Sequence, residues 1–159
     1  MIGSNAPVLA ISMGEPAGIG GEIILKAWAQ RSSVNPFFVI DDPGRLKKIT
    51  NRTKLKVPIQ TISSPSETLQ VFSQALPVLP VELVAPLPAP VVPGQPDAAN
   101  AKAVIASIEV AVKLIMKGEA DAIVTNPIHK KTLYDAGFLY PGHTEFLAFL
   151  AKLKTSPIM

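Results

Sequence analysis

Three short apolar runs in this chain lack the alternation of polar and apolar residues that marks a half-exposed strand. They occupy residues 8–12, 37–40 and 122–124. Such a run is typical of a strand that is buried on both faces, as in a parallel sheet covered by helices. Helical patterns lie between the runs, and this alternation of strand and helix predicts a largely parallel α/β sheet.

The segments between these runs carry start and stop signals for helices. Asp42 followed by Pro43 is typical of an N-cap and a first helical residue, and it predicts a short basic helix over residues 43–50. Asp97 is a suitable N-cap for a longer helix, which Gly118 would end. Apolar residues recur at the spacing of one helix face in two stretches. They are Ile23, Ile24, Ala27 and Trp28 in the first, and Val104, Ile105, Ile108, Val112 and Ile115 in the second.

The prolines in the middle of the chain limit which secondary structure can be expected there. Residues 57–61 predict an edge strand because they contain Pro58, and Ser64 with Glu67 has the spacing of a capping box that opens a brief helix. Seven prolines between Pro77 and Pro96 exclude a helix interior. The same stretch is too apolar for a solvated linker, so we expect extended chain packed on the body, with at most one edge strand. Its apolar residues include Val78, Leu79, Val81, Leu83 and Val84.

Composition excludes several classes of protein. Of the 159 residues 48% are hydrophobic, which is enough for a buried core. The formal net charge is +3 without long runs of like charge, so neither nucleic acid nor a membrane surface is an expected partner. The absence of cysteine excludes disulfides and thiolate metal sites and fits a reducing compartment. No apolar run has the length of a membrane span and no signal-peptide pattern is present, so we expect a cytoplasmic protein.

The first candidate site is the glycine-rich turn over residues 13–21, between the first strand and the first helix. Gly14 and Gly18 allow backbone conformations with positive φ, and amides at a helix start can hold an anion. The glycine spacing differs from the G-x-G-x-x-G dinucleotide fingerprint, and the lysine and hydroxyl of a P-loop are absent. A ligand-cleft loop and a plain tight turn are equal alternatives here. Glu15 at the tip would orient a ligand in the first case and be solvated in the second.

The second candidate site covers residues 125–131, directly after the third apolar run. Ligands of open α/β sheets gather beyond the carboxyl ends of the strands, so this position favours a function. Lys130 or Lys131 can pair with a phosphate or carboxylate. His129 can donate a hydrogen bond or act as an acid or base near neutral pH. The alternative is the solvated start of a short helix.

The third candidate site is the sequence Pro-Gly-His-Thr-Glu over residues 141–145. A helix is expected to start at His143 or Thr144, and its positive end disfavours protonation of the imidazole, which leaves a lone pair for a ligand. A single histidine does not make a metal site, so a ligand and a hydrogen-bonded structural histidine are open alternatives. The apolar stripe expected along this helix consists of Phe146, Leu147, Leu150 and Leu153.

Three stretches of the chain together resemble one family. They read MGEPAGIGGEI, VVPGQPDAANAKAVIASIEVAVKLIMKGEADAIVTNPIHKKTLYDAGF and YPGHTEFLA. In order and spacing they are similar to the N-terminal half of the 4-hydroxythreonine-4-phosphate dehydrogenases of pyridoxal phosphate biosynthesis. The family often has Asp where Glu15 stands and Pro where Gly21 stands. The resemblance runs from about Leu9 to the last residue.

This resemblance implies a fold, cofactors and residue roles. The fold would be that of isocitrate and isopropylmalate dehydrogenases, a partial α/β/α sandwich, in a protein that forms a homodimer. The cofactors would be NAD and a divalent metal (zinc, magnesium or cobalt). His143 would be the first of three metal-binding histidines, while His129 and Lys130 would contact a small phosphorylated substrate. No catalytic residue is assigned.

The reaction implied by the resemblance is oxidation of the 3-hydroxyl of 4-phosphooxy-L-threonine by NAD. Loss of carbon dioxide then gives 3-amino-2-oxopropyl phosphate. Alternatives are a dehydrogenase of a related phosphorylated hydroxy acid and a non-catalytic ligand-binding or assembly module. These alternatives are separated by an assay of NADH formation.

The resemblance also implies a division of the chain. Residues 1–125 would belong to a first α/β domain, and residues 126–159 would begin a second domain that carries the substrate and metal motifs. The chain has only two histidines, so a three-histidine metal site cannot be completed within it. We therefore expect a fragment without its C-terminal half that is inactive alone, with residues 155–159 entering a further strand.

Overall fold

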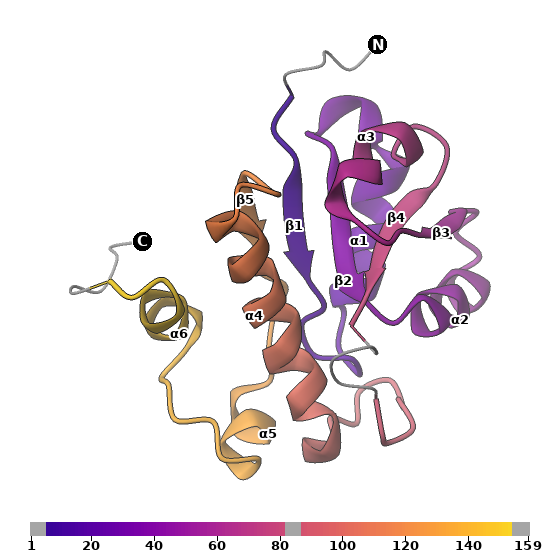
Figure 1. Ribbon diagram of the computed structural model, residues 1–159. Helices are drawn as coiled ribbons and strands as arrows, with labels where there is room; N and C mark the ends of the chain where they lie inside the picture. Colours follow the sequence, from indigo (N-terminus) through magenta and orange to yellow (C-terminus); the bar gives the residue numbers. More distant parts are fainter. Residues whose placement is uncertain (1–5, 82–86, 154–159) are drawn as a thin grey trace.

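A five-stranded parallel sheet forms the centre of the computed structural model, which describes residues 6–81 and 87–153 (Figure 1). The strand order is β3-β4-β2-β1-β5, and every neighbouring pair is parallel. The predicted parallel α/β sheet is therefore confirmed. The strands are β1 (Leu9–Ser12), β2 (Phe37–Asp41), β3 (Ile59–Thr61), β4 (Leu76–Pro80) and β5 (Ala122–Val124).

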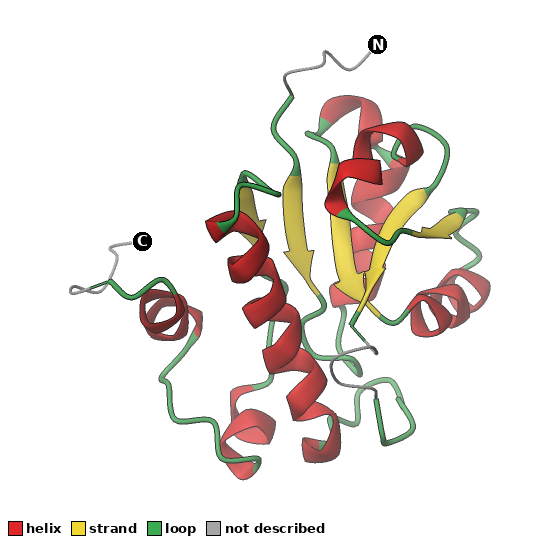
Figure 2. Cartoon of the chain, in the orientation of Figure 1, coloured by secondary structure: helices red, strands yellow, loops and turns green. Residues whose placement is uncertain are grey.

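Helices connect the strands and cover both faces of the sheet (Figure 2). The longest helix, α4, crosses one face, while α1 lies on the opposite face (Figure 1). The helices are α1 (Gly20–Ala29), α2 (Pro43–Thr53), α3 (Thr68–Val71), α4 (Ala101–Met116), α5 (Lys130–Asp135) and α6 (His143–Leu150). Short 3-10 turns are η1 (Arg31–Ser33), η2 (Pro65–Glu67) and η3 (Ala98–Asn100).

The two faces of β2 belong to two separate apolar cores. Phe38 and Ile40 pack with side chains of α4, whereas Phe37 and Val39 pack with side chains of α1 and α2. Successive residues of a strand point to opposite faces, so a strand between two helical layers is expected to be apolar at nearly every position, as Phe37 to Ile40 are. All five residues of β2 are buried. The unbroken apolar run thus encodes a three-layer α/β/α arrangement.

The predicted caps are present at three helix starts. Oδ1 of Asp42 accepts hydrogen bonds from the amides of Gly44 and Arg45, at 2.6 Å and 3.2 Å. Ser64 and Glu67 form the expected capping box, which opens η2. Asp97 accepts a hydrogen bond of 2.8 Å from the amide of Ala99 and so caps η3, which leads into α4. These side chains satisfy amides that have no partner within their own helix.

β3 lies at the sheet edge as predicted, but the expectation of at most an edge strand among the prolines was wrong. β4 lies between β3 and β2 although it contains Pro77 and Pro80. Amides along a strand point alternately to its two sides: the amide of Leu76 donates toward the β3 segment and that of Val81 donates to β2. By this alternation Pro77 faces β2 before their pairing begins at Val78, and Pro80 faces β3 after their pairing ends. Neither proline removes a hydrogen bond from the ladder.

Two further expectations need correction. β5 was predicted to be buried, yet Val124 is 43% exposed, because within the described sheet β5 pairs only with β1. The helix that starts at His143 ends at Leu150, so Leu153 lies beyond it and is exposed. The strand expected over residues 155–159, and the packing expected of Leu83 and Val84, lie outside the described residues. Within the described parts, no helix is both long and apolar enough to cross a membrane.

Candidate functional site

The loops that follow β1 and β5 meet at Gly14. Its φ is +68°, a conformation that strongly favours glycine. A Cβ at this position would lie 2.6 Å from Cβ of Asn126 and 2.7 Å from the carbonyl oxygen of Pro127. The amide of Glu15 donates a hydrogen bond of 2.9 Å to that same carbonyl oxygen. Gly14 therefore lets the first and second candidate sites come into direct backbone contact.

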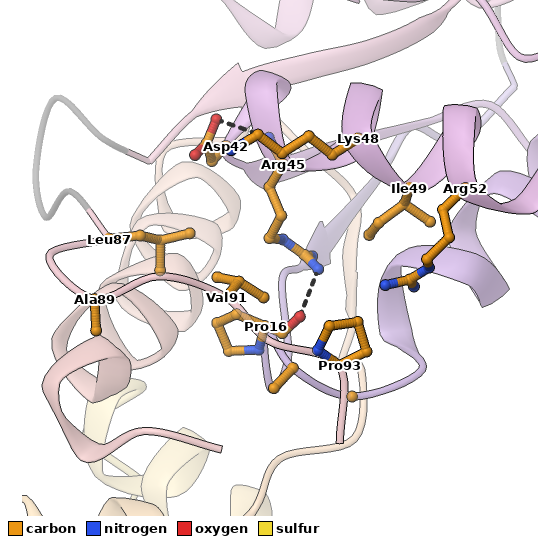
Figure 3. Close-up of a pocket in the computed structure, with 12 residues that line it drawn as sticks. Pro16, Asp42, Arg45, Lys48, Ile49, Arg52, Leu87, Ala89, Val91 and Pro93 are labelled. Carbon is orange, nitrogen blue, oxygen red and sulfur yellow. Dashed lines mark hydrogen bonds between the residues drawn. The ribbon is translucent and has the colours of Figure 1, made fainter. Parts of the chain in front are cut away.

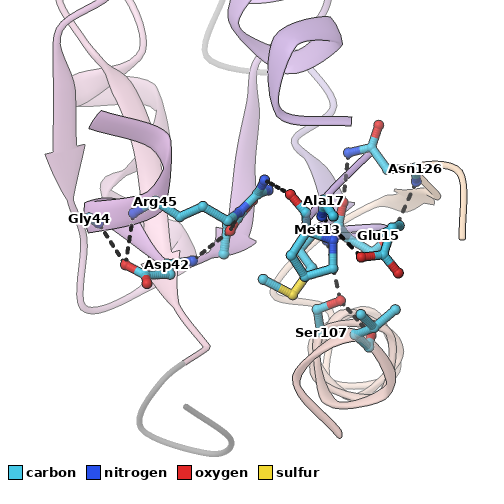
Figure 4. A network of polar contacts seen from close by, with 12 residues as sticks. Met13, Glu15, Ala17, Asp42, Gly44, Arg45, Ser107 and Asn126 are labelled. Atoms are coloured by element: carbon cyan, nitrogen blue, oxygen red, sulfur yellow. Dashed lines mark hydrogen bonds and ion pairs between the residues drawn. The ribbon is translucent and has the colours of Figure 1, made fainter. Parts of the chain in front are cut away.

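A buried polar network holds this junction against β1 and α4 (Figure 4). Nδ2 of Asn126 donates to the carbonyl oxygen of Ser12 at 2.8 Å, and the amide of Asn126 donates to Oγ of Ser12 at 3.3 Å. The amide of Met13 donates to Oγ of Ser107 on α4 at 3.2 Å. Sequence reasoning missed this network, because single serine and asparagine residues carry no pattern.

The side chain of Glu15 turns back into its own loop. It is only 6% exposed, and its Oε1 accepts a hydrogen bond of 3.0 Å from the amide of Ala17. The amide of Gly18 donates to the carbonyl oxygen of Glu15 at 3.0 Å. Two amides of the loop, those of Ala17 and Gly18, are thus used internally, which favours the tight-turn interpretation over an anion-binding loop. Of the two alternatives for Glu15, a ligand contact and a solvated side chain, the solvated one was wrong.

A buried ion pair fastens α2 to the same loop. Arg45 donates from Nε and Nη2 to the carboxylate of Asp41 at 2.9 Å and 2.6 Å, and from Nη1 to the carbonyl oxygen of Pro16 at 3.0 Å. Burial acts to raise the pKa of Asp41, and the charge of Arg45 acts in the opposite direction. Sequence reasoning missed this pair. The signal in the sequence was Asp41, an acidic residue at the end of an apolar run and four residues before Arg45.

His129 caps the short helix α5 instead of pointing freely into a cleft. Its Nδ1 accepts a hydrogen bond of 3.3 Å from the amide of Thr132 and also contacts Oγ1 of Thr132. The residue is exposed. Its Nε2 remains the ring nitrogen that can contact a ligand, so the predicted substrate contact stays a prediction.

Lys130 and His143 come together at the start of α6, in a group that we call the histidine corner (Lys130, Gly142, His143 and Glu145). A Cβ placed on Gly142 would lie 3.6 Å from Nζ of Lys130 and 3.6 Å from Oε2 of Glu145. Nε2 of His143 is buried and has no hydrogen-bond partner among the described residues. Burial, and then the charge of Lys130, lowers the pKa of His143. The corner thus holds a neutral imidazole beside an ammonium group.

The histidine corner does not by itself fit a divalent metal. The described residues contain no group of three or more His, Cys, Asp or Glu side chains that could hold a metal ion. The ammonium of Lys130 would also repel a dication, whereas it would attract an anion. The role of His143 as a metal ligand therefore stays a prediction.

The titration of His143 leads to a prediction about stability. The pKa is lowered in the folded chain, so as the pH falls the unfolded chain binds the proton first. The stability that depends on neutral His143 is thus complete above the ordinary value of 6.5 and is lost between that value and the lower folded pKa. In urea unfolding over this pH window, wild type should lose stability relative to His143→Gln. A constant difference between the two proteins would contradict the prediction.

Comparisons with known proteins agree with these motifs. The family model described as "Pyridoxal phosphate biosynthetic protein PdxA" matches residues 33–159. The chain belongs to the PdxA family. A PdxA relative from Methylorubrum populi, named 4-hydroxythreonine-4-phosphate dehydrogenase, is 48% identical over 145 residues, which are 90% of this chain and 41% of the relative. The chain therefore spans about two fifths of the length of the curated relatives that it matches.

Solved structures of several dehydrogenases share the fold. A 4-hydroxythreonine-4-phosphate dehydrogenase from Burkholderia phymatum has a TM-score of 0.82 and 32% identity, over 96% of this chain and 46% of that one. A terephthalate 1,2-cis-dihydrodiol dehydrogenase from Burkholderia xenovorans has a TM-score of 0.71 and 26% identity, over 92% and 41%. The predicted α/β fold of the isocitrate and isopropylmalate dehydrogenase type is thus confirmed. The domain boundary after residue 125 stays a prediction.

Proposed function

We propose that this chain supplies part of the active site of a 4-hydroxythreonine-4-phosphate dehydrogenase. The enzyme would oxidise the 3-hydroxyl of 4-phosphooxy-L-threonine with NAD, and decarboxylation would give 3-amino-2-oxopropyl phosphate. The observation that carries the proposal is the histidine corner, which lies within the part of the chain that matches a family whose curated members are named 4-hydroxythreonine-4-phosphate dehydrogenase. A cytoplasmic homodimer belongs to the same proposal.

Each residue of the corner has a proposed role. The ammonium of Lys130 binds the phosphate or carboxylate of the substrate through a charge-assisted hydrogen bond. Neutral His143 accepts a hydrogen bond at Nε2 from the substrate hydroxyl, which places a base beside the proton that leaves during oxidation. The lowered pKa of His143 keeps the imidazole neutral at neutral pH, so one of its ring nitrogens has a free lone pair. His129 contacts the substrate through Nε2 at the start of α5.

The test uses a chimera in which residues 1–159 are followed by the remaining part of the Methylorubrum populi relative. NADH formation from 4-phosphooxy-L-threonine is measured with added divalent metal for the chimera and for the chain alone. We expect activity only in the chimera. An inactive but folded chimera would overturn the substrate assignment, and activity of the chain alone would overturn the predicted inactivity.

Two lysines allow a matched comparison in the same chimera. Lys130→Met should raise KM by about tenfold, because it removes a charged contact to the substrate. Lys131→Met is the control, since Nζ of Lys131 already pairs with Asp135 at 2.6 Å on the exposed side of α5. Equal effects of the two changes would contradict the role of Lys130.

His143→Gln distinguishes the two roles considered for His143. If His143 contacts the substrate, the variant should lose turnover and keep the metal affinity of the unaltered chimera. If it is a metal ligand, metal affinity should fall together with turnover.

A panel of substrates that includes a cis-dihydrodiol tests the second candidate substrate class, which the Burkholderia xenovorans structure suggests.

A further inference from the structure

A cavity of about 240 Å³ lies against the glycine-rich turn over residues 13–21, and no residue of the histidine corner lines it (Figure 3). Its walls come from loop residues 16–18, from one face of α2 and from the extended segment 87–93. No predicted site residue except Gly18 belongs to it. The cavity therefore needs an account of its own.

The cavity combines apolar walls with a basic rim. Leu87 and Val91 line one side, and Ile49 of α2 faces them across the space (Figure 3). Lys48 and Arg52 bring two exposed positive charges to the same α2 face. Apolar lining with a few charged groups at one end is the usual composition of a small-molecule site.

The charges at the rim are only partly neutralised. Arg52 pairs with Glu22 at 3.0 Å in an exposed ion pair, which is weak in water. Lys48 has no ion-pair partner among the described residues. The one carboxylate that lines the cavity, that of Asp42, already accepts two amide hydrogen bonds at the start of α2. Among the side chains that line the cavity, positive charges outnumber the single negative one, and Lys48 is the positive charge that no ion pair among the described residues offsets, so the end of the cavity at Lys48 favours an anion.

Hydrogen bonds hold the walls in place without a ligand. Arg45 fixes the carbonyl oxygen of Pro16, as described above. The amide of Gly94 donates to the carbonyl oxygen of Ala17 at 2.8 Å, and the amide of Ala89 donates to Oδ1 of Asn100 at 3.1 Å. A preformed cavity lowers the entropic cost of binding.

We propose that this cavity binds a small anion with an apolar body, separately from the histidine corner. The apolar body would lie against Leu87, Val91 and Ile49, and the phosphate or carboxylate would lie between Lys48 and Arg52. The volume is below the roughly 300–1,000 Å³ of sites for drug-sized ligands, so the cavity is too small to enclose a whole dinucleotide. The proposal is independent of the substrate assignment.

The test is titration of the chain with phenyl phosphate, followed by NMR of the backbone amides. Benzoate tests a carboxylate head on the same ring, inorganic phosphate tests the head alone, and benzyl alcohol tests the ring without a charge. We expect phenyl phosphate or benzoate to shift the amides of Ala17, Gly18 and Ala89. Both should bind more tightly than inorganic phosphate or benzyl alcohol.

Variants on α2 locate the anion. Lys48→Gln and Arg52→Gln should each weaken binding about fivefold, and Lys47→Gln should leave it unchanged because this exposed neighbour does not line the cavity. Glu22→Gln should tighten binding, since it releases Arg52 from its ion pair. Ala89→Leu should abolish binding by filling the cavity while the amide spectrum stays dispersed.

Three results would overturn the proposal. One is the absence of shifts at millimolar phenyl phosphate and benzoate. Another is an affinity for inorganic phosphate equal to that for both aromatic anions, which would leave no role for the apolar walls. The third is an equal loss of affinity in Lys47→Gln and Lys48→Gln, which would indicate a diffuse charge effect.

Discussion

Arg45→Met is expected to lower the free energy of unfolding by about 3–5 kcal/mol, the range for removal of one partner from a buried ion pair. Asp41 is completely buried and would keep its charge without a counter-ion. The carbonyl oxygen of Pro16 would lose its donor in the same step. Urea unfolding followed by circular dichroism measures the loss.

The loss in Arg45→Met should depend on pH. Without Arg45 only the amide hydrogen bond from Asp42 still opposes the burial that raises the pKa of Asp41, so the folded variant binds a proton more readily than the unfolded chain. Stability of the variant should therefore fall as the pH rises above the unfolded pKa, and the deficit should be smaller in mild acid than at neutral pH.

Two controls accompany this prediction. Arg52→Met, on the same helix, should cost less than about 1 kcal/mol because its ion pair with Glu22 is exposed. Adding Asp41→Asn to Arg45→Met should recover part of the loss, since a neutral amide is cheaper to bury than a lone charge. Similar costs for the two arginine variants would show that Asp41 is solvated.

Gly14→Ala is expected to cost about 2–4 kcal/mol, from the positive φ and from overpacking. Its Cβ would meet Asn126 and the carbonyl oxygen of Pro127 at distances that force the backbone to move. The displaced segment leads directly to His129 and Lys130. The chimera carrying this change should therefore lose activity as well as stability.

Gly118→Ala separates the cost of the positive φ from the cost of overpacking. Gly118 has a φ of +73°, close to the +68° of Gly14, but a Cβ there would meet nothing within 4 Å. This variant should cost only about 1–2 kcal/mol, the strain of the left-handed conformation alone. An equal cost for the two variants would mean that the loops after β1 and β5 are not held in contact.

Much of the framework was predictable because local chemistry encodes it. The unbroken apolar run of β2 predicted burial on both faces, and the caps at Asp42, Ser64 and Asp97 predicted three helix starts. The position of β4 inside the sheet was not predictable from its sequence. Whether a strand tolerates a proline depends on which neighbouring strand the proline nitrogen faces. The exposure of β5 depends likewise on pairing partners that a local pattern does not identify.

The candidate site was predictable in part. The sequence predicted that His129 and Lys130 follow the carboxyl end of a strand. It also predicted that His143 lies at the start of a helix. The approach of Lys130 to Gly142 is a long-range contact that no spacing rule supplies. The internal use of Glu15 and the capping role of His129 were missed for a related reason: each side chain binds a nearby amide instead of a ligand.

The position of β1 has a consequence for how the chain folds. β1 pairs with β2 on one side, but its other neighbour begins at Ala122, and Asp121 binds Val8 through its carboxylate at 2.7 Å across 113 residues of sequence. During synthesis the strands β1 to β4 are complete by Pro80. Until residue 122 emerges, β1 is an open edge able to pair with another chain, so this non-local closure is the slow and aggregation-prone step.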